Sequence, residues 1–262
     1  MGQALCKQLS YIAALLRANG KAHYTEWKRP LLLSAFMVFQ NFLFFLLWVV
    51  FFGAVRQVKG WQLEDVALMF GLGATTIGLA LFMADGARTI ALAVQDGSIE
   101  SFLAKPRHPL PALLLSRSNA ASLGDIVSGP LWWVFFAHVT PWQFWGLLGL
   151  SVIAAVIFLA SLVMFFSLAF WVQRAEPLSY KLFEILITMT MVPQNVQPMG
   201  LKLAMFSVLP AGFMVFLPIT LLRDFSWPVL AVLLGATVVY SSLAVWVFNV
   251  GVRRYIGVNR LY

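Results

Sequence analysis

The chain has 262 residues, of which 61% are hydrophobic and 11% are charged, and its formal net charge is +8. Soluble domains carry roughly 25% charged residues, so this composition excludes an ordinary soluble domain and indicates an all-α polytopic membrane protein. The single cysteine, Cys6, excludes an internal disulfide framework. The basic balance alone would fit a nucleic-acid partner, but in a membrane chain its meaning depends on where the basic residues lie.

The first element that the sequence predicts is an amphipathic helix within residues 1–30. Its apolar residues fall at helical spacing, and they are Leu5, Leu9, Ile12 and Leu16. Basic residues accompany this apolar stripe. A helix of this kind lies in the membrane interface rather than crossing the bilayer, and we expect it on the cytoplasmic side.

Six apolar segments approach or exceed the length of about 20 residues that crosses a bilayer. They are residues 31–55, 66–83, 120–139, 145–172, 182–196 and 228–250. Between the last two segments lies an apolar block that contains Pro210 and Pro218, each of which breaks or kinks a helix. We therefore expect residues 198–222 to form a re-entrant hairpin on the outer side of the membrane. The alternative is a seventh, kinked span.

The distribution of lysine and arginine favours six spans with both chain ends in the cytoplasm. On this topology, 14 of the 18 basic residues fall in inner segments and 4 in outer segments, as the positive-inside rule requires. A seventh span would weaken the bias to 11 against 7. The basic residues are thus topology signals, and we expect a lipid environment and no nucleic-acid partner.

The sequence lacks the motifs of several enzyme classes. It contains no nucleotide-binding P-loop, no H-E-x-x-H and no G-x-S-x-G. Its three histidines, His23, His108 and His138, lie far apart in the sequence, so they form no metal-ligand motif. We therefore expect no catalytic residues, metal or cofactor in this chain.

Two carboxylates, Asp125 and Glu184, fall within predicted spans, where ionisable side chains are functional candidates. Each lies near the inner end of its span, and Lys181 precedes Glu184 at the spacing of a helical ion pair. A proton-coupled secondary transporter that uses Glu184 or Asp125 is therefore one alternative function. A non-transporting membrane scaffold subunit is another.

Other residues of the spans can pack helices together or line a pathway. Gly71, Ala74 and Gly78 form a stripe of small residues that lets another helix approach closely. Five residues of the second and fifth spans are weak candidates for the lining of a translocation pathway, and they are Thr75, Thr76, Met189, Gln194 and Asn195.

The longest polar segment, residues 85–117, is predicted to be cytoplasmic. Within it, the stretch "DGSIESFLAKP" predicts a short helix that Ser98 can cap. Ile99, Phe102 and Leu103 would share one apolar face of this helix. A helix of two turns is not stable alone, so we expect its apolar face to dock on a protein surface. The alternative is that the helix packs on its own membrane domain.

Three stretches of the sequence resemble the permeases of bacterial type-2 ABC transporters. "IESFLAKPRHPLPALLLSR" resembles the motif after the second span of that family, roughly G-x-[IL]-[DE]-x-x-L-x-[KR]-P. "FSVLPAGFMVFLPITLL" is similar to the family's proline-paired block, and "GVRRYIGVNRL" is similar to its basic C-terminal tail. One departure is "MVPQNVQPMG", which stands where the family has an aromatic-rich approach to the outer hairpin. The resemblance covers nearly the whole chain.

This resemblance implies a single permease domain over residues 1–262 in a bacterial inner membrane. It implies a separate ATPase subunit that binds ATP and magnesium, a second permease copy or paralogue, and transport in the direction of export. The short helix of residues 85–117 would be the coupling helix that contacts the ATPase subunit. The residues that we expect at this contact are Ile99, Glu100, Phe102, Leu103, Lys105 and Arg107.

Overall fold

A computed structural model describes residues 28–105 and 107–259 of the chain. Most of the predicted interface helix of residues 1–30 lies outside the described residues. Within the described part of the chain the regular elements are helices, and an isolated β-bridge joins Val58 to Trp61. The prediction of an all-α fold is thereby confirmed.

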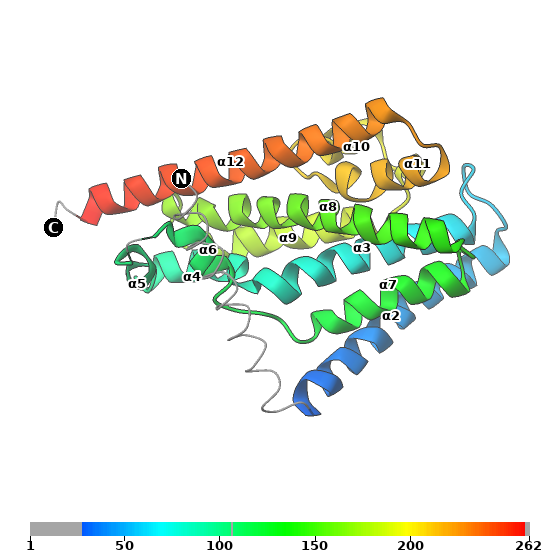
Figure 1. Cartoon of the computed structure of the whole chain (residues 1–262), viewed down its shortest axis with the longest axis horizontal. Coiled ribbons are helices and arrows are strands. Elements are labelled where there is room, and N and C mark those ends of the chain that lie inside the picture. The colour runs from blue at the N-terminus through cyan, green and yellow to red at the C-terminus, as the bar shows by residue number, and fades with distance from the viewer. Residues whose placement is uncertain (1–27, 106, 260–262) are drawn as a thin grey trace.

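Six helices form the body of the molecule and run alternately between its two ends (Figure 1). They are α2 (Lys28–Ala54), α3 (Leu63–Ala84), α7 (Ser122–Phe135), α8 (Pro141–Ser167), α9 (Glu176–Thr190) and α12 (Trp227–Asn259). Four of them, α2, α3, α8 and α12, are long and apolar enough to cross a membrane. The helices α7 and α9 have 14 and 15 residues, which is shorter than the roughly 20 residues of a complete span.

The boundaries of two helices differ from the sequence prediction. Helix α8 begins at Pro141, because Thr140 and Gln143 form a capping box at its start. Helix α9 begins at Glu176 and ends at Thr190, about six residues before the predicted segment at both ends. The helix starts earlier than predicted because its first turns contain charged residues, over which an apolar pattern does not extend. It ends earlier because Pro193 lies just beyond its last residue.

Short helices gather at the two ends of the molecule. At one end lie η1 (Asp85–Thr89), α4 (Ile90–Gln95), α5 (Glu100–Leu103) and α6 (Pro109–Leu114), beside the C-terminal end of α12 (Figure 1). At the other end lie α10 (Met199–Met205), η4 (Gly212–Phe216) and α11 (Leu217–Arg223).

The proline-rich segment between α9 and α12 contains a helix that Pro218 does not break. Pro210 precedes the helical residues, and Pro218 is the second residue of α11. The five residues before α11 form a π-helical turn, which accommodates a proline ring that would otherwise meet the carbonyl four residues earlier. Tyr240 of α12 donates a hydrogen bond to the carbonyl of Ser207, so this segment is attached to the last helix.

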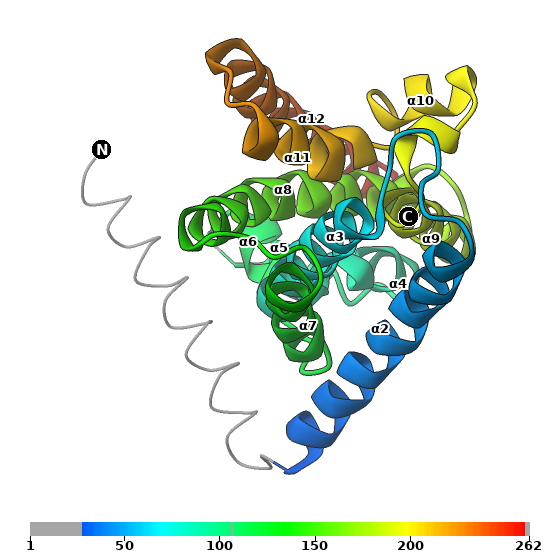
Figure 2. The ribbon, with the colours of Figure 1, turned by 90° about the vertical axis from the view of Figure 1, so that its right-hand side faces the viewer.

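Helix α3 occupies the centre of the bundle, with α2 and α12 on opposite edges (Figure 2). Its closest neighbour is α7. A Cβ atom added to Gly71 would lie 2.8 Å from the carbonyl oxygen of Gly129, and one added to Gly78 would lie 2.8 Å from the backbone nitrogen of Ile126. The predicted small-residue stripe therefore does let a second helix approach closely. In contrast, α2 and α12 expose most of their apolar side chains.

Candidate functional site

The polar loop of residues 85–117 folds over one end of the bundle and carries the predicted short helix as α5, a single turn. Gly97 precedes it with a φ of +77°, a left-handed conformation that favours glycine. The prediction that Ser98 caps this helix is wrong, because Ile99 occupies the N-cap position and makes no side-chain cap. Ser98 instead bonds Asp96. Hydrogen bonds from Ser98 lower the pKa of the Asp96 carboxyl. The bond from the Ser98 side chain has the larger effect, and the bond from its backbone N–H, at 2.9 Å, has the smaller.

The apolar face of α5 is partly used within the chain. Ile99 is fully buried (0% exposed), and its N–H donates to the carbonyl of Ala93 at 3.0 Å. Phe102 and Leu103 are half-buried against the core. The expectation of an exposed apolar trio is therefore wrong for Ile99, which anchors α5 to its own domain. Part of the surface of Phe102 and Leu103 remains exposed.

Charged residues surround this face as the sequence predicts. Glu100, Lys105 and Arg107 are all exposed. The ammonium of Lys105 lies 5.1 Å from the centroid of the Phe102 ring, which is within the range of a cation–π interaction. The surface around α5 thus combines an aromatic ring with charges of both signs.

The C-terminal end of α12 contacts this loop through side chains that the sequence did not point to. Tyr255 donates a hydrogen bond to Oε1 of Glu100 at 3.3 Å. His108 caps α6, because its Nδ1 accepts from the N–H of Leu110 at 3.3 Å. Its Nε2 therefore carries the proton and donates to Oδ1 of Asn249 at 2.9 Å. The two bonds to α12 join residues 141 and 155 positions apart, and local sequence patterns do not reveal contacts of this kind.

A buried carboxylate, Asp85, holds the start of the same loop. It forms ion pairs with Arg88 and with Arg117, whose Nε lies 3.1 Å from Oδ2 of Asp85. The guanidinium of Arg88 also lies 5.7 Å from the centroid of the Phe183 ring in α9. Sequence reasoning treated these residues as loop charges, although the i,i+3 spacing of Asp85 and Arg88 was a visible signal.

The two carboxylates expected inside spans have different surroundings. Asp125 of α7 is buried, and its Oδ1 accepts a hydrogen bond of 2.8 Å from the amide of Asn41 in α2. Glu184 is exposed and pairs with Lys181 at 3.0 Å, which confirms the predicted helical pair. Among the described residues, Asp125 has no cationic partner.

The five weak pathway candidates do not form one lining within this single chain. Thr75 and Thr76 are fully buried, and Thr75 donates to the carbonyl of Gly71 at 2.8 Å. Met189 is buried as well. Gln194 is half-buried and Asn195 is exposed, with the Asn195 amide donating to the carbonyl of Lys59 at 3.0 Å.

Within the described part of the chain, no group of three or more His, Cys, Asp or Glu side chains is placed to hold a metal ion.

Comparisons with known proteins identify the family of the chain. Neither a search of curated proteins nor a search of solved structures gave a match. Residues 38–258 match a protein family described as "ABC-2 family transporter protein", which covers most of the chain, including the loop with α5. The chain therefore belongs to this family of membrane components of ABC transporters.

Proposed function

We propose that the chain is the transmembrane subunit of an ATP-driven exporter whose ATPase subunit docks on α5. In this proposal the six helices of the body, including the shorter α7 and α9, are six spans, and both chain ends are cytoplasmic in a bacterial inner membrane. The partner subunit binds ATP and magnesium, and a second permease completes the transporter. The family membership supports the pairing with an ABC ATPase.

The observation that carries the coupling role is the way in which α5 is attached. Its outer face offers half-buried Phe102 and exposed Lys105, whereas its inner residue Ile99 is fully buried. A single helical turn is not stable alone, and here it is held by the core and by Tyr255 of α12. A displacement imposed on its outer face is therefore transmitted to membrane helices rather than absorbed in a free loop.

The arrangement of the helices supports the proposed topology. The loop with α5 and the C-terminal end of α12 lie at one end of the molecule, and α10 and α11 lie at the other (Figure 1). A segment that begins and ends at the far end fits a re-entrant hairpin between the fifth and sixth spans. Two basic residues near the end of α12, Arg253 and Arg254, then fall on the cytoplasmic side.

A second candidate is a proton-coupled transporter that uses Asp125. The observation in its favour is that this buried carboxylate bonds an amide and has no cationic partner among the described residues. Buried carboxylates within spans often serve proton transfer. Glu184 favours this candidate less, because it is exposed and already paired with Lys181.

One experiment separates the two candidates. The tagged chain is purified in mild detergent, its partners are identified by mass spectrometry, and the complex is reconstituted in vesicles. We expect a P-loop ATPase in stoichiometric amount, which Phe102→Asp and Lys105→Glu both release. Phe225→Asp, at an exposed phenylalanine of the opposite end, is the matched control and should retain the ATPase.

Transport in the same vesicles completes the test. We expect efflux of cargo to require ATP and to persist in Asp125→Asn without a proton gradient. Retention of a fully coupled ATPase by both α5 variants would refute the docking site. A chain that purifies alone and depends on a proton gradient and on Asp125 would replace the ABC exporter with the second candidate.

A further inference from the structure

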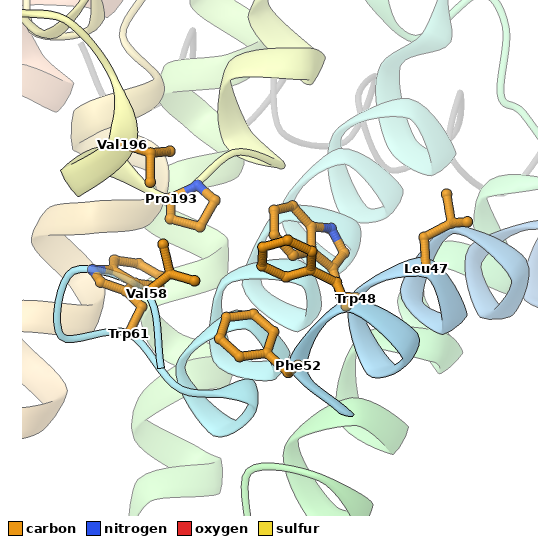
Figure 3. Close-up of a pocket in the computed structure, with 8 residues that line it drawn as sticks. Leu47, Trp48, Phe52, Val58, Trp61, Pro193 and Val196 are labelled. Atoms are coloured by element: carbon orange, nitrogen blue, oxygen red, sulfur yellow. The ribbon is translucent and has the colours of Figure 1, made fainter. Parts of the chain in front are cut away.

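An apolar cavity of about 430 Å³, whose lining is drawn in Figure 3, lies where α2 ends, at the end of the bundle opposite α5 (Figure 1). Its lining comes from the last turns of α2, the α2–α3 connection and the segment after α9, and consists of Leu47, Trp48, Phe51, Phe52, Val58, Trp61, Pro193 and Val196. Small-molecule sites have volumes of about 300–1,000 Å³. The cavity is therefore large enough to hold a ligand.

The walls of this cavity are fixed by contacts outside it. The β-bridge between Val58 and Trp61 closes a tight turn at Lys59 and Gly60, which both have positive φ angles. Asn195, from the segment after α9, donates to the carbonyl of Lys59. The two connections that enclose the cavity are thus bonded to each other.

The mouth of the cavity opens on an apolar surface of the molecule. Leu47 is 67% exposed and Phe51 is 44% exposed, yet both line the cavity. They continue the exposed apolar face of α2, which is the kind of face that meets lipid chains. A ligand therefore reaches the cavity from the apolar phase of the membrane.

A hollow next to the cavity contains an arginine, and an exposed lysine lies on the turn that carries Val58 and Trp61. Phe52 also lines a second hollow, which contains Arg56, Gln62 and Glu64. Within the described residues, Arg56 and Lys59 form no ion pair and no side-chain hydrogen bond. Glu64 contributes one carboxylate to this hollow and makes no ion pair with Arg56. The second hollow therefore holds one arginine and one carboxylate, and Lys59 is exposed on the turn between Val58 and Trp61 of the cavity lining.

The side chains of the cavity wall have few polar atoms. The indole N–H groups of Trp48 and Trp61 are the only side-chain hydrogen-bond donors of the lining, and both are without a partner in the described part of the chain. Tryptophans of this kind are typical of the membrane interface, where a polar and an apolar region meet. The site thus combines an apolar cavity, with two indole donors in its lining, and an arginine in the adjoining hollow.

We propose that this cavity binds the apolar chain of an anionic amphiphile whose headgroup lies at Arg56 in the adjoining hollow. The same chemistry can come from an anionic membrane lipid or from a single-chain amphiphile such as a fatty acid. The cavity, unlike the proposed coupling, needs neither ATP nor an ATPase subunit to be occupied. Failure of one proposal therefore leaves the other standing.

The test uses the full chain in nanodiscs of zwitterionic phosphatidylcholine, without ATP. The probes are a fatty acid that carries a photoreactive diazirine in its chain and the neutral alcohol of the same length. After illumination, the labelled residues are mapped by mass spectrometry. We expect labelling to concentrate on the residues of the cavity, with the acid labelling more than the alcohol.

Variants decide whether the labelling belongs to the cavity. Val196→Trp fills it from a side chain that is 39% exposed and should reduce cavity labelling by about tenfold. Leu47→Trp is a second filling variant if the first fails to fold. Val50→Trp, on the exposed face of α2, is the matched control. Arg56→Gln should abolish the preference for the acid, whereas Arg29→Gln, at the other end of α2, should retain it.

The remaining arms identify the source of the ligand and the results that overturn the proposal. Displacement of the acid by phosphatidylglycerol identifies a membrane lipid, and no displacement identifies a single-chain amphiphile. Equal labelling of the cavity and of the exposed face of α12, or labelling unchanged by the filling variants, overturns the proposal. So does equal labelling by acid and alcohol.

Discussion

The replacement Asp85→Asn tests whether the loop of residues 85–117 is held to the bundle by buried ion pairs. The Asp85 side chain is 2% exposed and contacts two arginines, Arg88 and Arg117, whose side chains are 20% and 65% exposed. Asparagine keeps the size of the side chain and removes its charge. The change therefore isolates the electrostatic contribution of this carboxylate.

The two ion pairs contribute unequally to the free energy of unfolding. The bond to the mostly buried Arg88 falls in the range of about 1.5–3 kcal/mol for hydrogen bonds to charged groups. The pair with the exposed Arg117 is screened by solvent and contributes about 0–1 kcal/mol. Arg88 keeps its contact with the Phe183 ring, so the loss lies near the lower end, at about 2 kcal/mol.

The assay is thermal unfolding of the detergent-purified full chain, together with hydrogen exchange of residues 85–117. A loss of about 2 kcal/mol lowers the Tm of a chain of this size by about 4–8 °C, and we expect faster exchange confined to the loop. Glu184→Gln is the control, because it breaks an ion pair whose side chains are 69% and 60% exposed. Equal shifts of Tm in the two variants would refute the reasoning.

Two further predictions concern the packing of α7. Gly78→Leu should destabilise the bundle by about 1–3 kcal/mol, the usual cost of overpacking, since even a Cβ atom there lies 2.8 Å from Cβ of Asp125. Gly235→Leu, where nothing lies within 4 Å, should leave the Tm unchanged, and an equal loss in both variants would contradict the role of the stripe. Asn41→Leu removes the donor to Asp125 and should cost about 0.6–1.7 kcal/mol in the same unfolding assay. Its neighbour Gln40 is exposed, so Gln40→Leu should cost nothing, and a neutral Asn41→Leu would show that the amide bond contributes no stability.

The sequence predicted the features that depend on local pattern. Uninterrupted apolar runs located α2, α3, α8 and α12, and the spacing of small residues predicted the close approach of a helix to α3. Lys181 and Glu184 paired as their spacing indicated. Each of these features is encoded within one or two helical turns, so periodicity alone reveals it.

The features that escaped prediction depend on contacts between distant segments. The sequence could not show whether Ile99 is buried or exposed, because the core of the chain and the surface of a partner would both favour an apolar residue at this position of α5. In the structure Ile99 is buried. The bond between His108 and Asn249 spans 141 positions. The apolar cavity likewise combines three segments that no local pattern connects.

Helix α9 links the two proposed sites physically. At its middle, the Phe183 ring lies against the guanidinium of Arg88 from the loop that carries α5. Beyond its end, Pro193 and Val196 line the apolar cavity. Spatial continuity becomes coupling only where the connecting element has two positions. Of the two helices, α9 is the one that contacts the loop directly, whereas the buried polar bonds of α2 go to α7. A displacement of α9 along or across the bundle would therefore change the shape of the cavity, while α2 remained bonded to α7.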